Sequence, residues 1–222
     1  MIKKILSYLT PITIFQTKSD LSKSIEVTWN NGELVLDSKN ANYSYGSLQR
    51  ILRHGLKEIG FNRIQPMQDI LVLGVAGGSV IKTLVDEIGF KGNITGVELD
   101  AEMARIANTY FQLDQIKNVT IIVDDAFEFV LKTKQKYDLI VIDVFQDTNM
   151  PNFLFESFFS NRICHLLRKN GFALFNTMIL NEMQNQRNKN FIAEFHATSC
   201  KIRSLPRLET HNELIIISKL ES

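Results

Sequence analysis

Three carboxylates stand where they could bind or act on a ligand at one edge of a sheet. Glu98, Asp125 and Asp143 each lie at or just beyond the end of an apolar run that is typical of a buried strand. Because the carboxyl ends of parallel strands share one edge, we expect these side chains to converge on one crevice. There they could accept hydrogen bonds from a ligand or take a proton. Asp100 and Asp124 stand where helices begin, so capping is their expected role.

A glycine-rich turn precedes these acids and predicts what the crevice binds. Residues 69 to 79 read Asp-Ile-Leu-Val-Leu-Gly-Val-Ala-Gly-Gly-Ser, and the apolar part suits a strand buried on both faces. Gly74, Gly77 and Gly78 allow a tight turn and a close approach of ligand to backbone, and Ser79 can cap the next helix. An acid about 20 positions beyond such a turn commonly accepts the hydroxyls of an adenosine ribose. Glu98 therefore predicts a nucleoside ligand.

The turn does not match the fingerprint of nicotinamide dinucleotide sites. The positions that should carry glycine hold Gly74, Ala76 and Ser79, so a nicotinamide cofactor is disfavoured. The alternative is a plain turn in an α/β domain with an empty crevice.

Composition bounds the class of partner. The chain has 222 residues, 45% of them hydrophobic, which allows one ordinary domain with an appendage. Lysine and arginine number 25 against 24 acids, so no global field draws it to nucleic acid or a membrane surface. A small-molecule partner is expected instead.

Metal and nucleophilic chemistry find no support in the sequence. The four histidines are scattered without metal-ligand spacing, and no Gly-x-Ser-x-Gly elbow is present. Only Cys164 and Cys200 occur, which suits a reducing, cytoplasmic compartment. The apolar stretch from residue 5 to residue 15 contains Pro11 and is too short to cross a bilayer, so we expect a packed N-terminal segment.

A β-hairpin is expected near the N-terminus. Asn31-Gly32 suits a type I′ turn, which would set Trp29 against Leu34 and Val27 against Leu36. One apolar face results, so the hairpin must cover either the main domain or another subunit, and the second case predicts a homodimer.

The elements between the motifs must hold the crevice together. Apolar runs at 70–73, 94–97, 119–123, 139–143 and 172–177 alternate with helical patterns, among them one over 153–168 that Asn170-Gly171 ends. This alternation predicts an α/β fold with a doubly wound, mostly parallel sheet, and residues 201–220 predict a closing antiparallel strand pair. We place the division between an N-terminal unit, 1–60, and an adenosyl-binding unit, 61–222, near Pro66.

Five segments in order resemble the spermidine synthase (polyamine aminopropyltransferase) family, whose core has the Rossmann-like fold of S-adenosylmethionine-dependent methyltransferases. The likeness covers residues 36 to about 176. It rests on Leu-Gly-Val-Ala-Gly-Gly-Ser at 73–79, Val-Glu-Leu-Asp at 97–100, Asp-Ala-Phe-Glu-Phe at 125–129, Tyr-Asp-Leu-Ile-Val-Ile-Asp at 137–143, and Leu-Phe-Glu-Ser-Phe-Phe at 154–159.

The resemblance implies roles for particular residues. It places Glu98 on the ribose and Asp125 on the adenine of an adenosyl sulfonium ligand, either S-adenosylmethionine or its decarboxylated form, and it makes Asp143 the catalytic aspartate. The remaining cofactor contacts that it implies are Gly74, Ala76, Gly77, Gly78 and Ala126.

Departures from the family pattern concern the acids that hold a polyamine. Gly77 replaces the aspartate of the family loop, and Gln146 replaces the second aspartate of the catalytic segment, although Asp147 stands next to it. Tyr45 lies near the family's Tyr-His-Glu site, whose other two places hold glycine and serine. We therefore expect Tyr45, Gln146 and Asp147 to form the substrate gate.

These losses favour methyl transfer. A diamine is a dication that needs a carboxylate at each end when it is desolvated. An aspartate at position 77 would repel the carboxylate of S-adenosylmethionine, and Gly77 removes that repulsion. The alternatives are aminopropyl transfer with Asp147 as the replacement acid, and a non-catalytic adenosyl-binding subunit.

Overall fold

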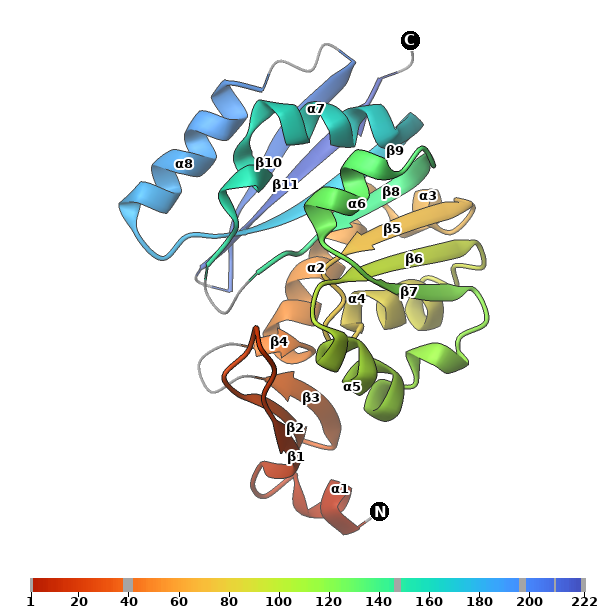
Figure 1. Cartoon of the computed structure of the whole chain (residues 1–222), viewed down its shortest axis with the longest axis vertical. Coiled ribbons are helices and arrows are strands. Elements are labelled where there is room, and N and C mark those ends of the chain that lie inside the picture. The colour runs from red at the N-terminus through yellow and green to blue at the C-terminus, as the bar shows by residue number, and fades with distance from the viewer. Residues whose placement is uncertain (1, 38–41, 146–148, 196–198, 210, 221–222) are drawn as a thin grey trace.

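The computed structural model describes residues 2–37, 42–145, 149–195, 199–209 and 211–220. Two sheets build the molecule (Figure 1). A seven-stranded sheet with the order β10-β11-β9-β8-β5-β6-β7 forms the larger part, and a four-stranded sheet with the order β1-β2-β3-β4 lies at the end that holds the N-terminus.

The large sheet has a parallel centre and an antiparallel edge. Its parallel strands are β5 (Asp69–Leu73), β6 (Asn93–Glu98), β7 (Val119–Val123), β8 (Tyr137–Ile142) and β9 (Leu167–Met178); β10 (Cys200–Leu208) and β11 (Asn212–Lys219) complete it. β11 runs antiparallel to both β9 and β10. The predicted doubly wound sheet with a C-terminal antiparallel pair is thus confirmed, and its order reverses between β5 and β8.

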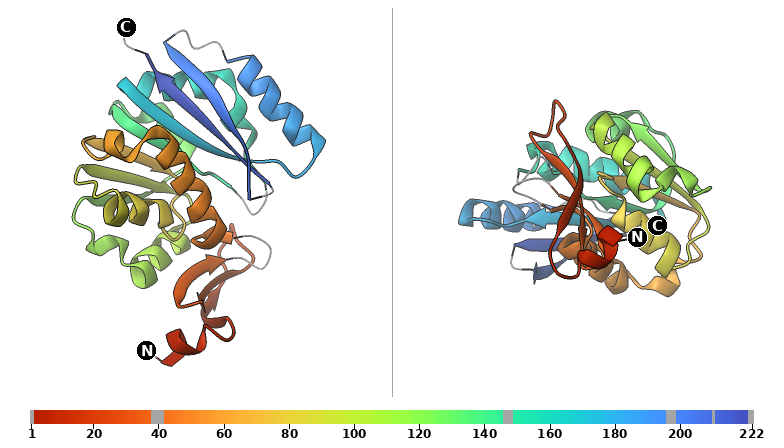
Figure 2. Two further views of the ribbon diagram at one scale, coloured as in Figure 1. Left: turned by 180° about the vertical axis from the view of Figure 1, so that it is seen from behind. Right: turned by 90° about the horizontal axis from the view of Figure 1, so that it is seen from below.

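Both faces of the sheet are covered, which explains the apolar runs without alternation. On one face lie α2 (Gly46–Ile59), α3 (Phe61–Ile64), α4 (Ser79–Lys82) with its π-helical continuation (Thr83–Glu87), and α5 (Ala101–Phe111). On the other lie α6 (Ala126–Lys132), α7 (Ser157–Leu166) and α8 (Glu182–Ala193). Val72 packs into the first layer while Leu71 and Leu73 pack into the second. Figure 2 shows the two layers from behind and below.

β9 begins earlier than the sequence predicts. We expected a helix to residue 168, ended by Asn170-Gly171, but α7 ends at Leu166 and the strand starts at Leu167. Asn170 has φ 59°, and a Cβ at Gly171 would lie 2.9 Å from the Asp138 carbonyl oxygen. The pair therefore forms an irregularity within the β8–β9 pairing instead of a helix cap.

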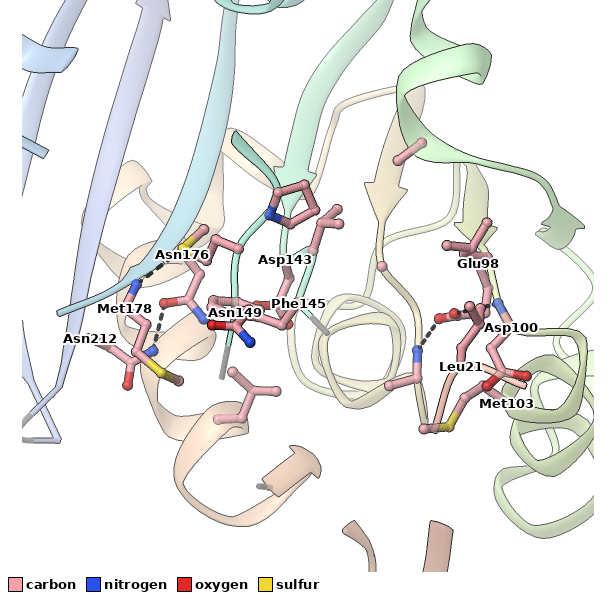
Figure 3. Close-up of a pocket in the computed structure, with 18 of the residues that line it drawn as sticks. Leu21, Glu98, Asp100, Met103, Asp143, Phe145, Asn149, Asn176, Met178 and Asn212 are labelled. Atoms are coloured by element: carbon pink, nitrogen blue, oxygen red, sulfur yellow. Dashed lines mark hydrogen bonds between the residues drawn. The ribbon is translucent and has the colours of Figure 1, made fainter. Parts of the chain in front are cut away.

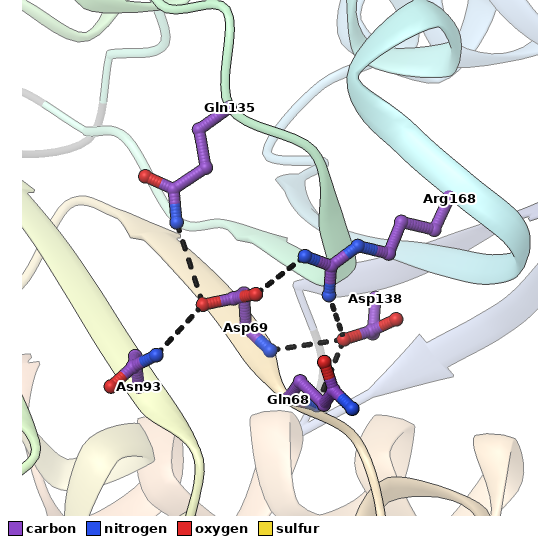
Figure 4. Close-up of polar contacts among 6 residues, drawn as sticks. All are labelled: Gln68, Asp69, Asn93, Gln135, Asp138 and Arg168. Atoms are coloured by element: carbon purple, nitrogen blue, oxygen red, sulfur yellow. Dashed lines mark hydrogen bonds and ion pairs between the residues drawn. The ribbon is translucent and has the colours of Figure 1, made fainter.

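Arg168 at the start of β9 ties the strands together at their amino ends (Figure 4). Its guanidinium donates to Asp138 at 2.7 Å and to Asp69 at 2.6 Å. Asp138 also accepts from the backbone N–H groups of Gln68 and Asp69, and Asp69 accepts from Asn93. This ion-pair cluster therefore links the beginnings of β5, β6, β8 and β9.

The predicted hairpin is present inside a larger N-terminal sheet. It consists of β2 (Ile25–Asn30) and β3 (Glu33–Asp37), and β1 (Ile12–Thr17) and β4 (Asn42–Ser44) flank it; α1 (Ile2–Leu6) precedes them. The register pairs Val27 with Leu36 and Trp29 with Leu34, as predicted. Asn31 and Gly32 both have positive φ, 48° and 79°, as a type I′ turn requires.

The apolar face of the hairpin covers the main domain. Val27 and Leu36 are fully buried against a surface of α5 that includes Met103, Ile106 and Phe111. The sequence left open whether this face meets the main domain or another subunit, and within this chain it meets α5.

Helix α2 belongs by its packing to the large sheet. Its buried residues Leu52 and Leu56 join the same core as Leu174 and Leu214. A Cβ at Gly55 would lie 2.6 Å from a Leu174 methyl carbon, so glycine lets the helix approach the sheet closely. We therefore propose that the two units divide before α2 rather than at residue 60. None of the helices in the described part of the chain is both long and apolar enough to span a membrane.

Candidate functional site

A cavity of about 650 Å³ opens at the carboxyl ends of the parallel strands, where the strand order reverses. Gly74 after β5, Glu98 at the end of β6 and Asp143 after β8 all line it. Such a volume suits a ligand of the size of a nucleoside cofactor together with a small acceptor. Figure 3 shows Asp143 between two groups of side chains, with Glu98 and Asp100 on one side and Asn176 and Asn212 on the other.

The glycine turn brings two strand ends into contact. Gly74 has φ 83°, and a Cβ there would lie 2.1 Å from the Asp143 carbonyl oxygen. Gly78 has φ 76° and faces Leu113. Of the predicted cofactor contacts in this turn, Gly74 and Ala76 line the cavity, while Gly77 and Gly78 are not among its lining residues. Those two glycines shape the turn from behind.

Glu98 holds the turn through backbone hydrogen bonds. Its Oε2 accepts from the N–H groups of Val75 at 3.0 Å and Ala76 at 2.9 Å, and its Oε1 accepts from that of Asp100 at 3.0 Å. Burial raises the pKa of the Glu98 carboxyl, although the three backbone donors oppose that effect. A carboxylate offers about four acceptor positions, so one on Oε1 stays available to a ligand hydroxyl.

Apolar side chains next to Glu98 form one wall of the cavity, and hydrogen bonds hold the residue at its border in place. Leu99 and Met103 line the cavity, and Leu99 is 42% exposed. Asp100 caps α5 by accepting from the Glu102 N–H at 2.9 Å, which confirms its expected role. It also accepts from the Ser19 hydroxyl, which joins the segment between β1 and β2 to the cavity.

Asp125 both caps α6 and lines the cavity. Its Oδ1 accepts from the N–H groups of Phe127 at 2.7 Å and Glu128 at 3.1 Å, which is the geometry of an N-cap. The cavity wall includes Asp125 and Ala126, the two contacts that the sequence placed here. The same carboxylate thus caps the helix and faces the cavity.

Asp143 stands at the centre of the cavity. Its N–H donates to the Leu73 carbonyl at 2.9 Å, and its Oδ1 accepts from Asn176 Nδ2 at 2.8 Å. Burial raises the pKa of this carboxyl to about 6, Asn176 acts against the shift, and the nearby Glu98 charge adds to it. At neutral pH such a group is mostly ionised and is poised to take a proton.

The far side of the cavity holds residues that the sequence analysis missed. Amide groups of Asn149, Asn176 and Asn212 line it together with the thioethers of Met150 and Met178. The signal that could have pointed to Asn176 is a polar residue inside the apolar run 172–178. Glu209 also lines this side, and its carboxylate accepts from Arg50 at 2.7 Å.

The three predicted gate residues fall outside the cavity wall or outside the described chain. Tyr45 is not a lining residue: its ring stacks on Phe111 with centroids 4.9 Å apart, and its hydroxyl donates to the Gly77 carbonyl at 3.2 Å. Burial raises the pKa of that hydroxyl. Gln146 and Asp147 lie outside the described residues.

Ser79 is the first residue of α4 and does not cap it, contrary to the expected role. The N-cap position is Gly78, and the Ser79 N–H donates to Ser44 Oγ at 3.1 Å. The helix that begins beside the glycine turn is therefore capped by β4 of the N-terminal sheet.

In chemical terms, one side of the cavity can hold a nucleoside and its centre can accept a proton. Among the described residues, no group of three or more histidine, cysteine, aspartate and glutamate side chains could hold a metal ion.

Comparison with known proteins finds relatives of two kinds, polyamine aminopropyltransferases and methyltransferases. Residues 50–208 match the family model described as Spermine/spermidine synthase domain. The polyamine aminopropyltransferase of Vibrio vulnificus is 27% identical over 129 residues, which are 57% of this chain and 43% of that protein. The eEF1A lysine and N-terminal methyltransferase homolog of Drosophila melanogaster is 32% identical over 80 residues, 35% of this chain and 12% of the fly protein. The chain therefore spans less than half of these relatives.

Solved structures of both kinds share the fold. A spermidine synthase in complex with the transition state analogue AdoDATO superposes with a TM-score of 0.67 at 16% identity, covering 94% of this chain and 74% of that one. Human methyltransferase-like protein 13 in complex with SAH gives 0.63 at 18% identity, covering 80% and 83%.

Proposed function

This chain belongs to the spermine/spermidine synthase domain family, and on that premise we propose that it transfers a methyl group from S-adenosylmethionine to a small acceptor. The observation that carries the proposal is the placement of Glu98 and Asp143 on one cavity, the first beside an apolar wall and the second with its pKa near 6. Glu98 can bind a sugar hydroxyl, and Asp143 can take the proton of a nucleophile.

The residues around Glu98 fit an adenosyl group. The free acceptor position on Glu98 Oε1 would receive a ribose hydroxyl. Leu99 exposes apolar surface that an adenine ring would cover, the buried Met103 borders the same part of the cavity, and Asp125 would accept from the adenine amino group. Gly74 permits the close approach, since a side chain there would collide with the Asp143 backbone.

Asp143 would orient the acceptor and remove its proton. The bound cofactor supplies a methyl group on positively charged sulfur, so catalysis needs mainly alignment and proton removal. The ionised carboxylate of Asp143 accepts the acceptor's N–H or O–H, and the cavity wall holds the acceptor in line.

The turn bears on the choice of cofactor only through the charge that it lacks, because position 77 does not line the cavity. Position 77 carries no acid, and a Cβ there would lie 2.9 Å from Ser44 Cβ and 3.2 Å from the Tyr45 ring. Without a carboxylate in the turn, the methionine carboxylate of S-adenosylmethionine meets no repulsion from it.

Aminopropyl transfer from decarboxylated S-adenosylmethionine to a polyamine is the second candidate. The bacterial relatives favour it, and so does Glu209, a second carboxylate on the acceptor side, although Arg50 already pairs with it. In this case Asp147 would supply the missing acid, and Asp143→Asn and Asp147→Asn would each abolish putrescine turnover.

Calorimetry separates the candidates. We expect S-adenosylmethionine to bind more tightly than its decarboxylated form, because the turn lacks an acid. Glu98→Gln should weaken binding at least about tenfold, since a hydrogen bond to a charged group is lost. Glu128→Gln, an exposed change on α6, is the matched control and should bind as the parent does.

Two results would contradict the proposal. Tighter binding of the decarboxylated cofactor would favour aminopropyl transfer. Absence of heat with S-adenosylmethionine, its decarboxylated form and S-adenosylhomocysteine would contradict adenosyl binding itself. With binding established, mass detection of products from a panel of amines and polyamines identifies the acceptor.

A further inference from the structure

A chain of hydrogen bonds runs from Asp143 into the C-terminal part of the sheet (Figure 3). Asn176 Nδ2 donates to Asp143 Oδ1 at 2.8 Å, and Asn212 Nδ2 donates to Asn176 Oδ1 at 3.0 Å. The three residues come from the end of β8, from β9 and from β11, which are neighbours in the sheet. Asn176 is 0% exposed and Asn212 is 7% exposed.

The direction of these bonds matches an ionised Asp143. A side-chain amide has a donor end and an acceptor end, and its orientation follows from its partners. Because the Asn212 amino group can only donate, Asn176 must turn its oxygen toward Asn212 and its own amino group toward Asp143. If both amides were reversed, the Asn176 oxygen would face the carboxylate and repel it.

We propose that Asn176 is a positioning residue that fixes the Asp143 carboxylate for proton transfer, and that Asn212 orients Asn176. With Oδ1 engaged by Asn176, Asp143 presents Oδ2 to the acceptor. The role rests on the proposed function, in which Asp143 takes the acceptor's proton. The amide pair adds no charge, so it holds the carboxylate without neutralising it.

The Asn176–Asn212 pair also counteracts the rise in the Asp143 pKa that the surroundings cause. Donation from Asn176 favours the ionised form, whereas burial and the Glu98 charge favour the neutral form. Asp100 and Asp125 line the cavity on the Glu98 side, and Glu209 and His211 line it as well. Loss of the Asn176 donor leaves burial and Glu98 unopposed, so the pKa of Asp143 should rise.

Titration of the Asp143 carboxyl by NMR in the cofactor-free protein tests this without reference to activity. Asp143→Asn identifies the resonance. We expect Asn176→Leu to raise this pKa by about one unit, and Asn212→Leu to raise it by less. Thr177→Val is the matched control: Thr177 is the next residue of β9, equally buried, and bonds to Glu213 and Asn188 away from the cavity.

Enzyme kinetics provide the second readout. Asn176→Leu should lower kcat about tenfold at pH 7 with an unchanged KM for S-adenosylmethionine. The acidic limb of the pH dependence of kcat/KM should move to higher pH by as much as the pKa measured by NMR rises. Asn176→Ser is a smaller change for the case that leucine prevents folding, and it should give the same direction of shift.

The outcomes separate this proposal from the proposed function. The positioning role is overturned if the Asp143 pKa is the same in the parent, in Asn176→Ser and in Asn212→Leu. It is also overturned if Thr177→Val raises this pKa as much as the asparagine variants do. Raised pKa values in the asparagine variants of a protein that transfers no methyl group support the hydrogen-bond chain and overturn the proposed function.

Discussion

At the scale of single residues, Asp143 is placed at a cost to stability. Its folded pKa of about 6 lies above the ordinary value of 3.8 because the half-buried carboxyl is partly shielded from water. The stabilising contribution of a group with a raised pKa is complete below about pH 4 and is lost as the pH rises through 6. At neutral pH the native state therefore carries a partly desolvated charge.

Asp143→Asn should accordingly stabilise the cofactor-free protein while abolishing transfer. We expect the free energy of unfolding at pH 7.5 to rise by about 1–2 kcal/mol, less than the full shift implies because the side chain is only half-buried. The gain should vanish near pH 4. Urea unfolding at both pH values measures it, and a variant less stable than the parent at pH 7.5 would contradict the argument.

Sequence reasoning predicted the acids of the cavity and missed its amides. Glu98 and Asp143 stand at strand ends, and that position alone predicts that they line the cavity. Asn176 and Asn212 follow no motif, because their role depends on β9 and β11 lying side by side in antiparallel register. That pairing is a long-range property that periodicity does not encode.

At the scale of elements, the N-terminal sheet supports the proposed cofactor site from outside the cavity. β4 supplies Ser44, whose hydroxyl accepts the first N–H of α4, and Tyr45 after it donates to the Gly77 carbonyl. Ser19 between β1 and β2 donates to Asp100. The glycine turn and α5 are thus both tied to this sheet.

Ser44→Ala should loosen the turn from outside the cavity. We expect a loss of about 1 kcal/mol in the free energy of unfolding, as for other removed helix caps, and a cofactor affinity several-fold weaker because the turn is less preorganised. Calorimetry and urea unfolding measure the two effects. Ser24→Ala, one residue before β2, is the control, since the Ser24 hydroxyl donates to Glu26 of that strand and not to the glycine turn. Equal losses in both variants would refute a specific role for Ser44.

Elements with one strong local signal were predicted well, and those that depend on partners were not. The hairpin register follows from Asn31-Gly32 and is confirmed. β1 and β4 carry no such signal, and they become strands only because the hairpin offers them two edges. The start of β9 at Leu167 likewise depends on its pairing with β8.

At the scale of the whole molecule, the ion pairs that stabilise the sheet and the cavity lie at opposite ends of its strands. The ion-pair cluster around Arg168 lies at the amino ends of the strands, and the cavity lies at their carboxyl ends. Hydrogen bonds from Asn93 and Arg168 outweigh burial and keep the pKa of Asp69 below its ordinary value. The stability that Asp69 contributes is therefore present at neutral pH and lost as the pH falls through that lowered value.

Arg168→Met should lower the free energy of unfolding by about 1–3 kcal/mol at pH 7, because two partly buried carboxylates lose their partner. Cofactor affinity should not change, since the cluster is remote from the cavity. Arg105→Met removes an exposed pair with Glu102 on α5 and should cost no more than about 0.5 kcal/mol. A tenfold loss of cofactor affinity in Arg168→Met would contradict this separation.

The arrangement of the cavity about Asp143 has a consequence for how such enzymes diversify. Leu21, Glu98, Asp100 and Met103 lie on one side and come from the first half of the chain, whereas Asn149, Asn176, Met178 and Asn212 lie opposite and come from the second. Under the proposed function, mutations that accumulate after Asp143 would alter which molecule is modified, while the part of the chain before it continues to bind the shared donor. A chimaera joined after Asp143 would inherit its donor from one parent and its acceptor from the other.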